Sequence, residues 1–146
     1  MRVKANLHFH SDADPKHPGI RHSTREGIDR AADLGFRVLA LTCHGRCRTT
    51  EELVGYALDR GVFLIPGIEA DIRAAAPGAR MNHVLILNCN RSAEQVRTFA
   101  DLRDYRLANP GIFVMAPHPF YYGNVSLKQN LEKHVDLFDA IEHCWF

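Results

Sequence analysis

The chain has 146 residues, of which 46% are hydrophobic and 24% charged, and its formal net charge is +1. These values are ordinary for one soluble globular domain, so we treat residues 1–146 as a single domain. The balanced charge gives no support for a nucleic-acid or membrane surface built on bulk charge. No apolar run is long enough for a transmembrane helix.

Cysteine usage and the start of the sequence indicate a cytoplasmic protein. The four cysteines form no CxxC pair, and the first residues lack the apolar core of a signal peptide. We therefore expect free thiols in a reducing compartment. Cys43 and Cys47 with His44 have the spacing of half a zinc finger, but no second half follows, so we interpret them as packing residues.

Apolar segments of strand length recur along the chain. They are rich in Val, Ile, Leu and Phe and nearly continuous, which is typical of strands buried on both faces. The predicted strands are residues 3–9, 36–42, 62–67, 83–88, 112–117 and 139–146.

Helices are predicted between most of these strands, because S/T-x-x-E/Q patterns mark their starts. In such a capping box, the hydroxyl and the acid or amide satisfy backbone groups of the first turn. The four matches are Ser23–Glu26, Thr49–Glu52, Ser92–Gln95 and Ser126–Gln129. Strands alternating with helices imply parallel strands joined by crossovers. One connection differs, because Pro77 and Gly78 predict a hairpin.

The sequence therefore predicts an α/β fold, either an open sheet or a barrel. No glycine-rich phosphate loop follows the first strand, which argues against a dinucleotide-binding fold. A barrel places its chemistry at the carboxyl ends of its strands.

Polar residues able to bind metals stand at these strand ends. His8 and His10 end the first strand, and residues i and i+2 of a strand point to the same face. Other strands end or begin with His44, Glu69 (with Asp71 two residues on), His83 and His118. Histidines together with a carboxylate suit Zn²⁺, Mn²⁺ or Fe²⁺ rather than Ca²⁺. His17, His22, His134 and His143 lack this context individually.

The segments "NLHFHSD", "LTCHG", "GIEAD", "NHVLIL" and "APHPF" together resemble the polymerase and histidinol phosphatase (PHP) superfamily. The resemblance implies a distorted seven-stranded β/α (TIM-like) barrel that holds two or three metal ions. It implies that His8 and His10 bind the first metal and that Glu69 bridges the first and second. His83 and His118 would bind the second metal and His44 the third.

Several features depart from the family pattern. Asn6 and Cys43 stand where the family often has Asp, and the further third-metal ligand is open between Asp14 and His17. The family's closing Asp-x-His motif is not found before Phe146. We therefore interpret the chain as a barrel lacking its last strand or strands, truncated from a longer protein. Glu142 or His143 could face the site.

The resemblance implies a metal-dependent phosphoesterase that hydrolyses a small-molecule phosphate monoester through a metal-bridging hydroxide. Glu69 and His118 are the expected catalytic residues, and Zn, Mn or Fe the expected ions, with Mg a poorer fit. Arg46, Arg48 and Arg80 are candidate phosphate ligands or ordinary surface residues.

Two alternatives remain, a phosphodiesterase or exonuclease and a non-catalytic metal-binding domain. The lack of a basic excess argues against a nucleic-acid substrate. An open barrel edge would favour a homo-oligomer.

Overall fold

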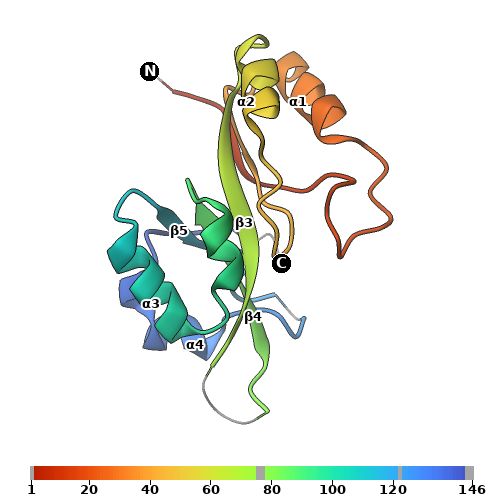
Figure 1. The fold of residues 1–146 in the computed structure, drawn as a ribbon. Coiled ribbons are helices and arrows are strands. Elements are labelled where there is room, and N and C mark those ends of the chain that lie inside the picture. The colour runs from red at the N-terminus through yellow and green to blue at the C-terminus, as the bar shows by residue number, and fades with distance from the viewer. Residues whose placement is uncertain (1, 75–77, 122, 144–146) are drawn as a thin grey trace.

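The computed structural model describes residues 2–74, 78–121 and 123–143. In these residues six strands form one sheet in the order β1-β2-β3-β4-β5-β6. Their bounds are Ala5–Phe9, Val38–Leu41, Phe63–Arg73, Met81–Leu87, Phe113–Ala116 and Ala140–Ile141. The sheet curls into a half-barrel around the long twisted strand β3 (Figure 1). This confirms the α/β class and agrees with a partial barrel, while a seventh strand stays a prediction.

Strand direction follows the sequence pattern with one exception. β1, β2 and β3 pair in parallel, as do β5 and β6. β4 pairs antiparallel with β3, which confirms the hairpin, although Pro77 itself lies outside the described residues. β4 also pairs antiparallel with β5, so the prediction of a parallel crossover is wrong at this connection. Once the hairpin has reversed β4, a β5 that runs with β3 must oppose it.

Two predicted strand ends differ from the structure. β3 was expected to stop at residue 67 but continues to Arg73, because its outer half gains β4 as a hydrogen-bonded partner. β6 is only Ala140–Ile141 within the predicted segment 139–146, of which residues 144–146 lie outside the described part. Glu69 is therefore a mid-strand residue.

The helices are α1 (Thr24–Asp33), α2 (Glu51–Leu58), α3 (Phe99–Ala108) and α4 (Gln129–Lys133). The capping box predicted at Ser23 is confirmed: its side chain accepts from the Glu26 backbone, and Glu26 accepts from the Ser23 backbone. The second box is wrong by one residue, since Thr50 caps α2. None of the described helices is long and apolar enough to cross a membrane.

The other two capping predictions are wrong. Residues 91–95 form a 3₁₀ turn that Asn90 caps, and Lys128 precedes α4 without a side-chain cap. The capping box of α3, in which Thr98 pairs with Asp101, was not predicted. The pattern required Glu or Gln at the fourth position, whereas this box uses the shorter acid Asp.

Helices cover the convex side of the sheet in two groups. α1 and α2 lie on one side of β3, and α3 and α4 lie on the other (Figure 1). Ile28 of α1 packs with Leu39 and Leu41, while Leu102 of α3 packs with Ile68 and Ile86. A smaller apolar cluster fills the sheet's other side: Ala40, Leu85, Leu87 and Met115, with Leu7, Ile65 and Ala140 against it.

The alternation along β3 explains how one strand serves the core and the concave face together. Ile68, Ala70 and Ile72 are fully buried in the cluster beneath α3. The intervening residues Glu69 and Asp71 point to the opposite face, because successive side chains of a strand alternate. Glu69 continues the side that carries Ile65, so the polar residues sit above the small apolar cluster.

Candidate metal centre

Six side chains from successive strands meet at one end of the half-barrel. His8 lies in β1, and His10 follows that strand directly. The others are His44 after β2, Glu69 within β3, His83 near the start of β4 and His118 just after β5. Because β4 runs in reverse, its beginning lies beside the carboxyl ends of its neighbours. The structure thus brings together all six residues that the sequence singled out.

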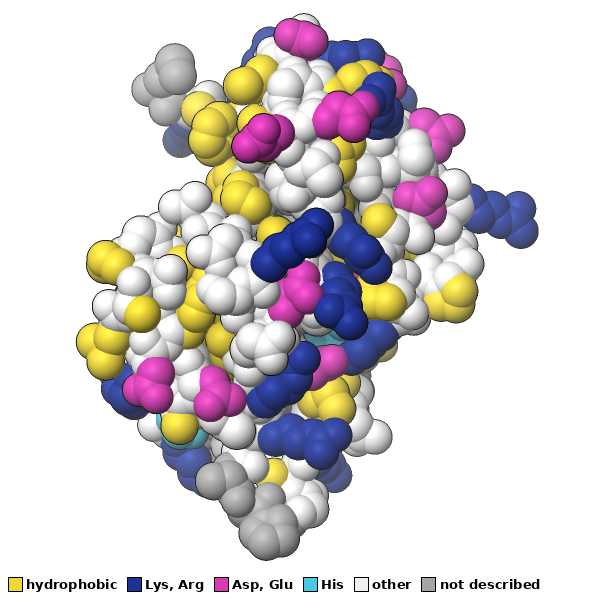
Figure 2. All heavy atoms as spheres, viewed as in Figure 1, with side chains coloured by type: hydrophobic (Ala, Val, Ile, Leu, Met, Phe, Trp, Pro, Cys, Tyr) yellow, Lys and Arg dark blue, Asp and Glu magenta, His cyan; other side chains and the backbone are white. Residues whose placement is uncertain are grey.

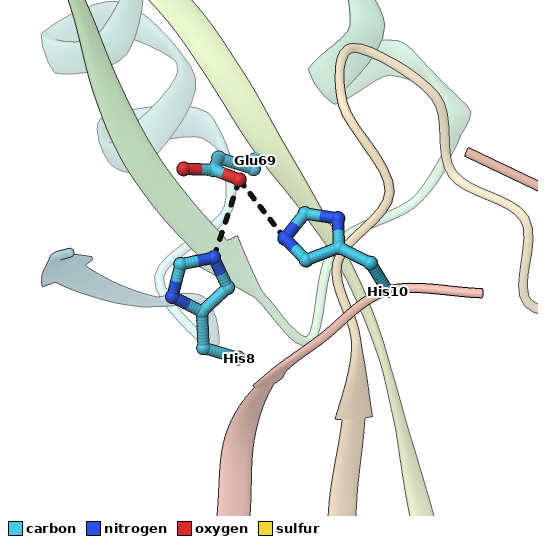
Figure 3. Close-up of side chains that lie close together, drawn as sticks. All are labelled: His8, His10 and Glu69. Carbon is cyan, nitrogen blue, oxygen red and sulfur yellow. Dashed lines mark hydrogen bonds and ion pairs between the residues drawn. The ribbon is translucent and has the colours of Figure 1, made fainter. Parts of the chain in front are cut away.

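The Glu69 carboxylate is the centre of this cluster. Its Oε2 lies 3.2 Å from His8 Nε2, 3.1 Å from His10 Nε2 and 3.0 Å from His44 Nε2. Its Oε1 lies 3.1 Å from His118 Nε2 and 2.6 Å from His83 Nδ1. Figure 3 shows the rings of His8 and His10 directed at the same oxygen. Five imidazoles therefore divide between the two oxygens of one buried carboxylate.

The carboxylates and imidazoles of this cluster shift one another's pKa values. Burial would raise the pKa of Glu69, but hydrogen bonds from the surrounding imidazoles outweigh it and hold that pKa far below its usual range. Burial would lower the pKa of His8, but Glu142 and Glu69 raise it to about 9. The pKa of His83 rises to about 9 as well, because Asp71 and Glu69 outweigh its burial. The metal-free cluster thus holds protons that a bound cation would replace.

A second carboxylate contacts two of the imidazoles at the ring nitrogens that face away from Glu69. Asp14 Oδ2 lies 2.5 Å from His10 Nδ1 and 2.9 Å from His44 Nδ1. Each ring therefore presents its Nε2 to Glu69 and its Nδ1 to Asp14, the arrangement that fixes the tautomer of metal-binding histidines. Asp14, one of the two open candidates for a further metal ligand, is fully buried on this outer side.

Glu142 has a similar outer role on the other side of the centre. Its Oε1 lies 3.1 Å from His8 Nδ1, and its Oε2 accepts a 2.8 Å hydrogen bond from the His118 backbone N–H. His118 has a φ of 30°, a left-handed value that a non-glycine residue adopts only at a cost in backbone energy. Glu142 therefore helps to hold both the ring of His8 and the backbone of His118.

A cavity of about 440 Å³ opens over the cluster. His17, the other open candidate, lines it from an exposed position, with its ring centroid 4.8 Å from that of His44. Tyr121 and Val125 also line it, and sequence reasoning missed both. Lys16, which forms an ion pair with Asp71, was missed too. Nothing in the local sequence pattern marks these three residues as neighbours of the histidines.

The three arginines proposed as phosphate ligands lie elsewhere. Arg46 forms a 2.8 Å ion pair with Glu94, and Arg48 and Arg80 are exposed. The cavity wall consists of His8, His10, His17, His44, Glu69, His83, His118, Tyr121 and Val125. The structure therefore places none of the three arginines in that wall.

The residues present fit a divalent metal ion. Three groups bring their ligand atoms within 4.8 Å of one another: His8, His10 and Glu69; His10, Asp14 and His44; His44, Glu69 and His83. The buried Nδ1 atom of His118 makes no hydrogen bond within the described part of the chain. Imidazoles with carboxylates, and no thiolate, are donors that suit Zn²⁺, Mn²⁺ and Fe²⁺.

Comparison with known proteins shows the fold. Models of known protein families and curated protein sequences give no match. Among solved structures, an amidohydrolase from Chromobacterium violaceum, with bound sulfate and no metal, is similar with a TM-score of 0.63. It shares 14% sequence identity, and the match covers 95% of this chain and 76% of that one.

A second similar structure comes from Bifidobacterium adolescentis and is provisionally described as a metal-dependent phosphoesterase. Its TM-score is 0.65 at 14% identity, and the match covers 97% of this chain and 77% of that protein. The half-barrel is therefore a fold shared with proteins that carry hydrolase names.

Proposed function

We propose that this protein is a metal-dependent hydrolase of phosphate esters, with a small-molecule monoester as substrate. The observation that carries the proposal is the division of five imidazoles between the two oxygens of Glu69. A carboxylate with separate sets of imidazoles at its two oxygens is suited to bridge cations. We assign two or three ions to the site, with Zn, Mn or Fe as the candidates.

Each residue has a defined task in this proposal. Glu69 would be shared between the cations. His8, His10 and His44 would hold an ion beside Oε2, and His83 and His118 would hold one beside Oε1. Asp14 and Glu142 fix the ring orientations. When bound, divalent cations lower the pKa of water, bind phosphoryl oxygens and neutralise leaving-group charge. No side chain has to become covalently attached to the substrate.

One observation favours phosphate over other groups. One similar structure carries the name of a metal-dependent phosphoesterase. Figure 2 shows Lys and Arg side chains across the middle of one face, with Asp and Glu side chains between them and a histidine visible there.

The second candidate function is hydrolysis of a carbon–nitrogen bond. The observation in its favour is the similarity to an amidohydrolase. Bridged cations activate water for attack on a carbonyl as well as on phosphorus, so the centre alone does not select the bond. A phosphodiesterase or exonuclease, or a non-catalytic metal-binding domain, would use the same ligands.

The test combines metal analysis with a substrate panel. The purified chain is loaded separately with Mn²⁺, Zn²⁺ and Fe²⁺, and bound metal is measured by elemental analysis. Each form is then assayed with p-nitrophenyl phosphate, bis-p-nitrophenyl phosphate, an oligonucleotide and an anilide. We expect metal-dependent turnover that is fastest on the monoester.

Glu69→Gln is the decisive variant, because it removes the bridging charge and keeps the side-chain shape. Loss of a residue that only orients a metal ligand lowers activity about 10- to 100-fold. Glu69 is expected to contact the metal directly, so the loss in Glu69→Gln should be larger. His134→Gln is the matched control, because His134 stacks on Phe99 away from the cluster. Faster turnover of the anilide would replace the proposal with the amide alternative. Equal slow turnover by parent and Glu69→Gln would reject catalysis at this centre.

A further inference from the structure

Two thiols from distant segments meet outside the metal centre. Cys47 lies between β2 and α2, and Cys89 follows β4. Both are free, both are buried in the same apolar cluster and both line one cavity, where the Cys89 thiol donates a 3.2 Å hydrogen bond to the Ile86 carbonyl. We propose that Cys47 and Cys89 are a reversible oxidation site, at which Cys47 reacts with a small hydroperoxide and Cys89 closes a disulfide.

A cavity gives an oxidant access to this pair. It has a volume of about 540 Å³, and both cysteines line it together with Thr49, Thr50 and Arg91, among others. It shares no lining residue with the cavity over the histidines. Cys47 and Cys89 are only 8% and 5% exposed, so the site suits a compact oxidant such as hydrogen peroxide better than a bulky one.

The surroundings give the two thiols different roles. The neighbouring Cys89 side chain, and then the Thr49 backbone N–H, lower the pKa of Cys47 to about 7 against its burial, and the Arg91 cation adds to this. The neighbouring Cys47 side chain and burial raise the pKa of Cys89 above its usual range. Glu94 opposes ionisation of Cys47 but is paired with Arg46. Cys47 is thus the nucleophile, since the thiolate is the reactive form.

The chemistry needs a hydroperoxide and, for reversal, a dithiol. The Cys47 thiolate attacks one peroxide oxygen. An S–O bond forms, the O–O bond breaks, and the leaving alkoxide or hydroxide takes up a proton, which leaves Cys47 as a sulfenic acid. Cys89 then loses its proton and attacks the Cys47 sulfur. The S–S bond forms, the S–O bond breaks, and hydroxide leaves as water. A dithiol reductant restores both thiols by exchange.

Cys43 provides the internal comparison. It stands four residues before Cys47, is fully buried, and its pKa is raised by that burial. It does not line the cavity that contains the cysteine pair. Cys43 should therefore stay reduced while Cys47 and Cys89 react.

The experiment treats the purified full chain with one equivalent of hydrogen peroxide, followed by mass spectrometry of the intact protein and its peptides. We expect the loss of two hydrogen atoms, a Cys47–Cys89 disulfide, and full recovery with a dithiol. Cys47→Ser should slow peroxide consumption at least about 10-fold. Cys89→Ser should stop at a sulfenic acid on Cys47 that a 1,3-diketone probe labels.

Cys43→Ser is the matched control and should still form the Cys47–Cys89 disulfide. Circular dichroism checks that each variant is folded. A disulfide that contains Cys43 or Cys144 would overturn the proposal. Unchanged peroxide consumption by folded Cys47→Ser, or labelling of Cys89→Ser at another cysteine, would also overturn it.

Discussion

His83 lies diagonally across from Glu69 on the antiparallel partner strand, and its Nδ1 is 2.6 Å from Glu69 Oε1. The register pairs Glu69 with Leu85 and Asp71 with His83, so the two strands bring one carboxylate and one imidazole together two positions apart. This contact exists because β4 runs antiparallel to β3. A parallel fourth strand would carry its first residues to the opposite end of the sheet.

Replacement of His83 by Gln should empty one part of the centre. Among the described residues, His118 alone would remain on the Oε1 side of Glu69, whereas His8, His10 and His44 would still surround Oε2. We expect the metal content to fall by about one ion per chain, with a large loss of activity. His44→Gln should remove an ion from the other side, and the double variant should lose both. Unchanged metal content in His83→Gln would contradict a bridging Glu69.

The sequence was sufficient to predict the α/β class and the hairpin. Near-continuous apolar runs identified the strands, and Gly78, with a φ of 73°, marks the turn region between β3 and β4. It was not sufficient for the antiparallel pairing of β4 and β5, because pairing direction depends on where neighbouring strands already lie. The predicted end of β3 came too early because Pro66 and Gly67 are typical of a strand end. The residues after Gly67 continue the strand because they pair with β4, and this pairing is not visible in the local sequence.

The convergence of the histidines was predictable, and their supporting groups were not. Position at a strand end is visible in sequence, so His8, His10, His44, His83 and His118 could be singled out together. The outer position of Asp14 depends on the path of the loop after β1, which turns its carboxylate toward His10 and His44 from behind. Tyr121 and Val125 reach the cavity through an irregular segment without any periodic pattern.

The fall of stability with rising pH should disappear when metal binds. In the metal-free chain, the pKa of His8 and that of His83 are raised from 6.5 to about 9. Their contribution to stability is therefore complete below pH 6.5 and is lost as the pH rises toward 9. We expect the Tm measured with a chelator to fall by several degrees over this range.

With saturating Mn²⁺ or Zn²⁺, this fall in Tm should be absent. Each imidazole must give up its proton to the solvent before it binds a cation, so the gain in Tm on adding metal should grow with pH. Differential scanning calorimetry with and without metal measures both trends. A metal-induced gain in Tm that shrank between pH 6.5 and pH 9 would contradict histidine ligation.

Asp14→Asn should weaken metal binding without emptying the centre. In the carboxylate, Oδ2 contacts both His10 Nδ1 and His44 Nδ1 while Oδ1 accepts from the Lys16 N–H. The amide has one acceptor oxygen and no charge, so it cannot replace both oxygens, and the rings lose part of their orientation. Loss of such an outer partner costs about 10- to 100-fold in metal affinity. Competition with a fluorescent chelator measures this. Asp136→Asn, which alters an exposed ion pair with Arg103, is the matched control and should bind metal as the parent does.

Two helix glycines should respond in opposite ways to replacement by alanine. Gly55 of α2 has open space around an added Cβ, so Gly55→Ala should stabilise the protein by about 0.5–1 kcal/mol through helix propensity. An added Cβ at Gly27 of α1 would lie 2.1 Å from Phe9 Cζ, which forces the ring to move. Overpacking of this kind costs about 1–3 kcal/mol and cancels or exceeds the propensity gain.

Since Phe9 stands between His8 and His10, Gly27→Ala should also weaken metal binding, whereas Gly55→Ala should not. Equal gains in urea midpoint for the two variants would show that α1 does not pack on Phe9 as described.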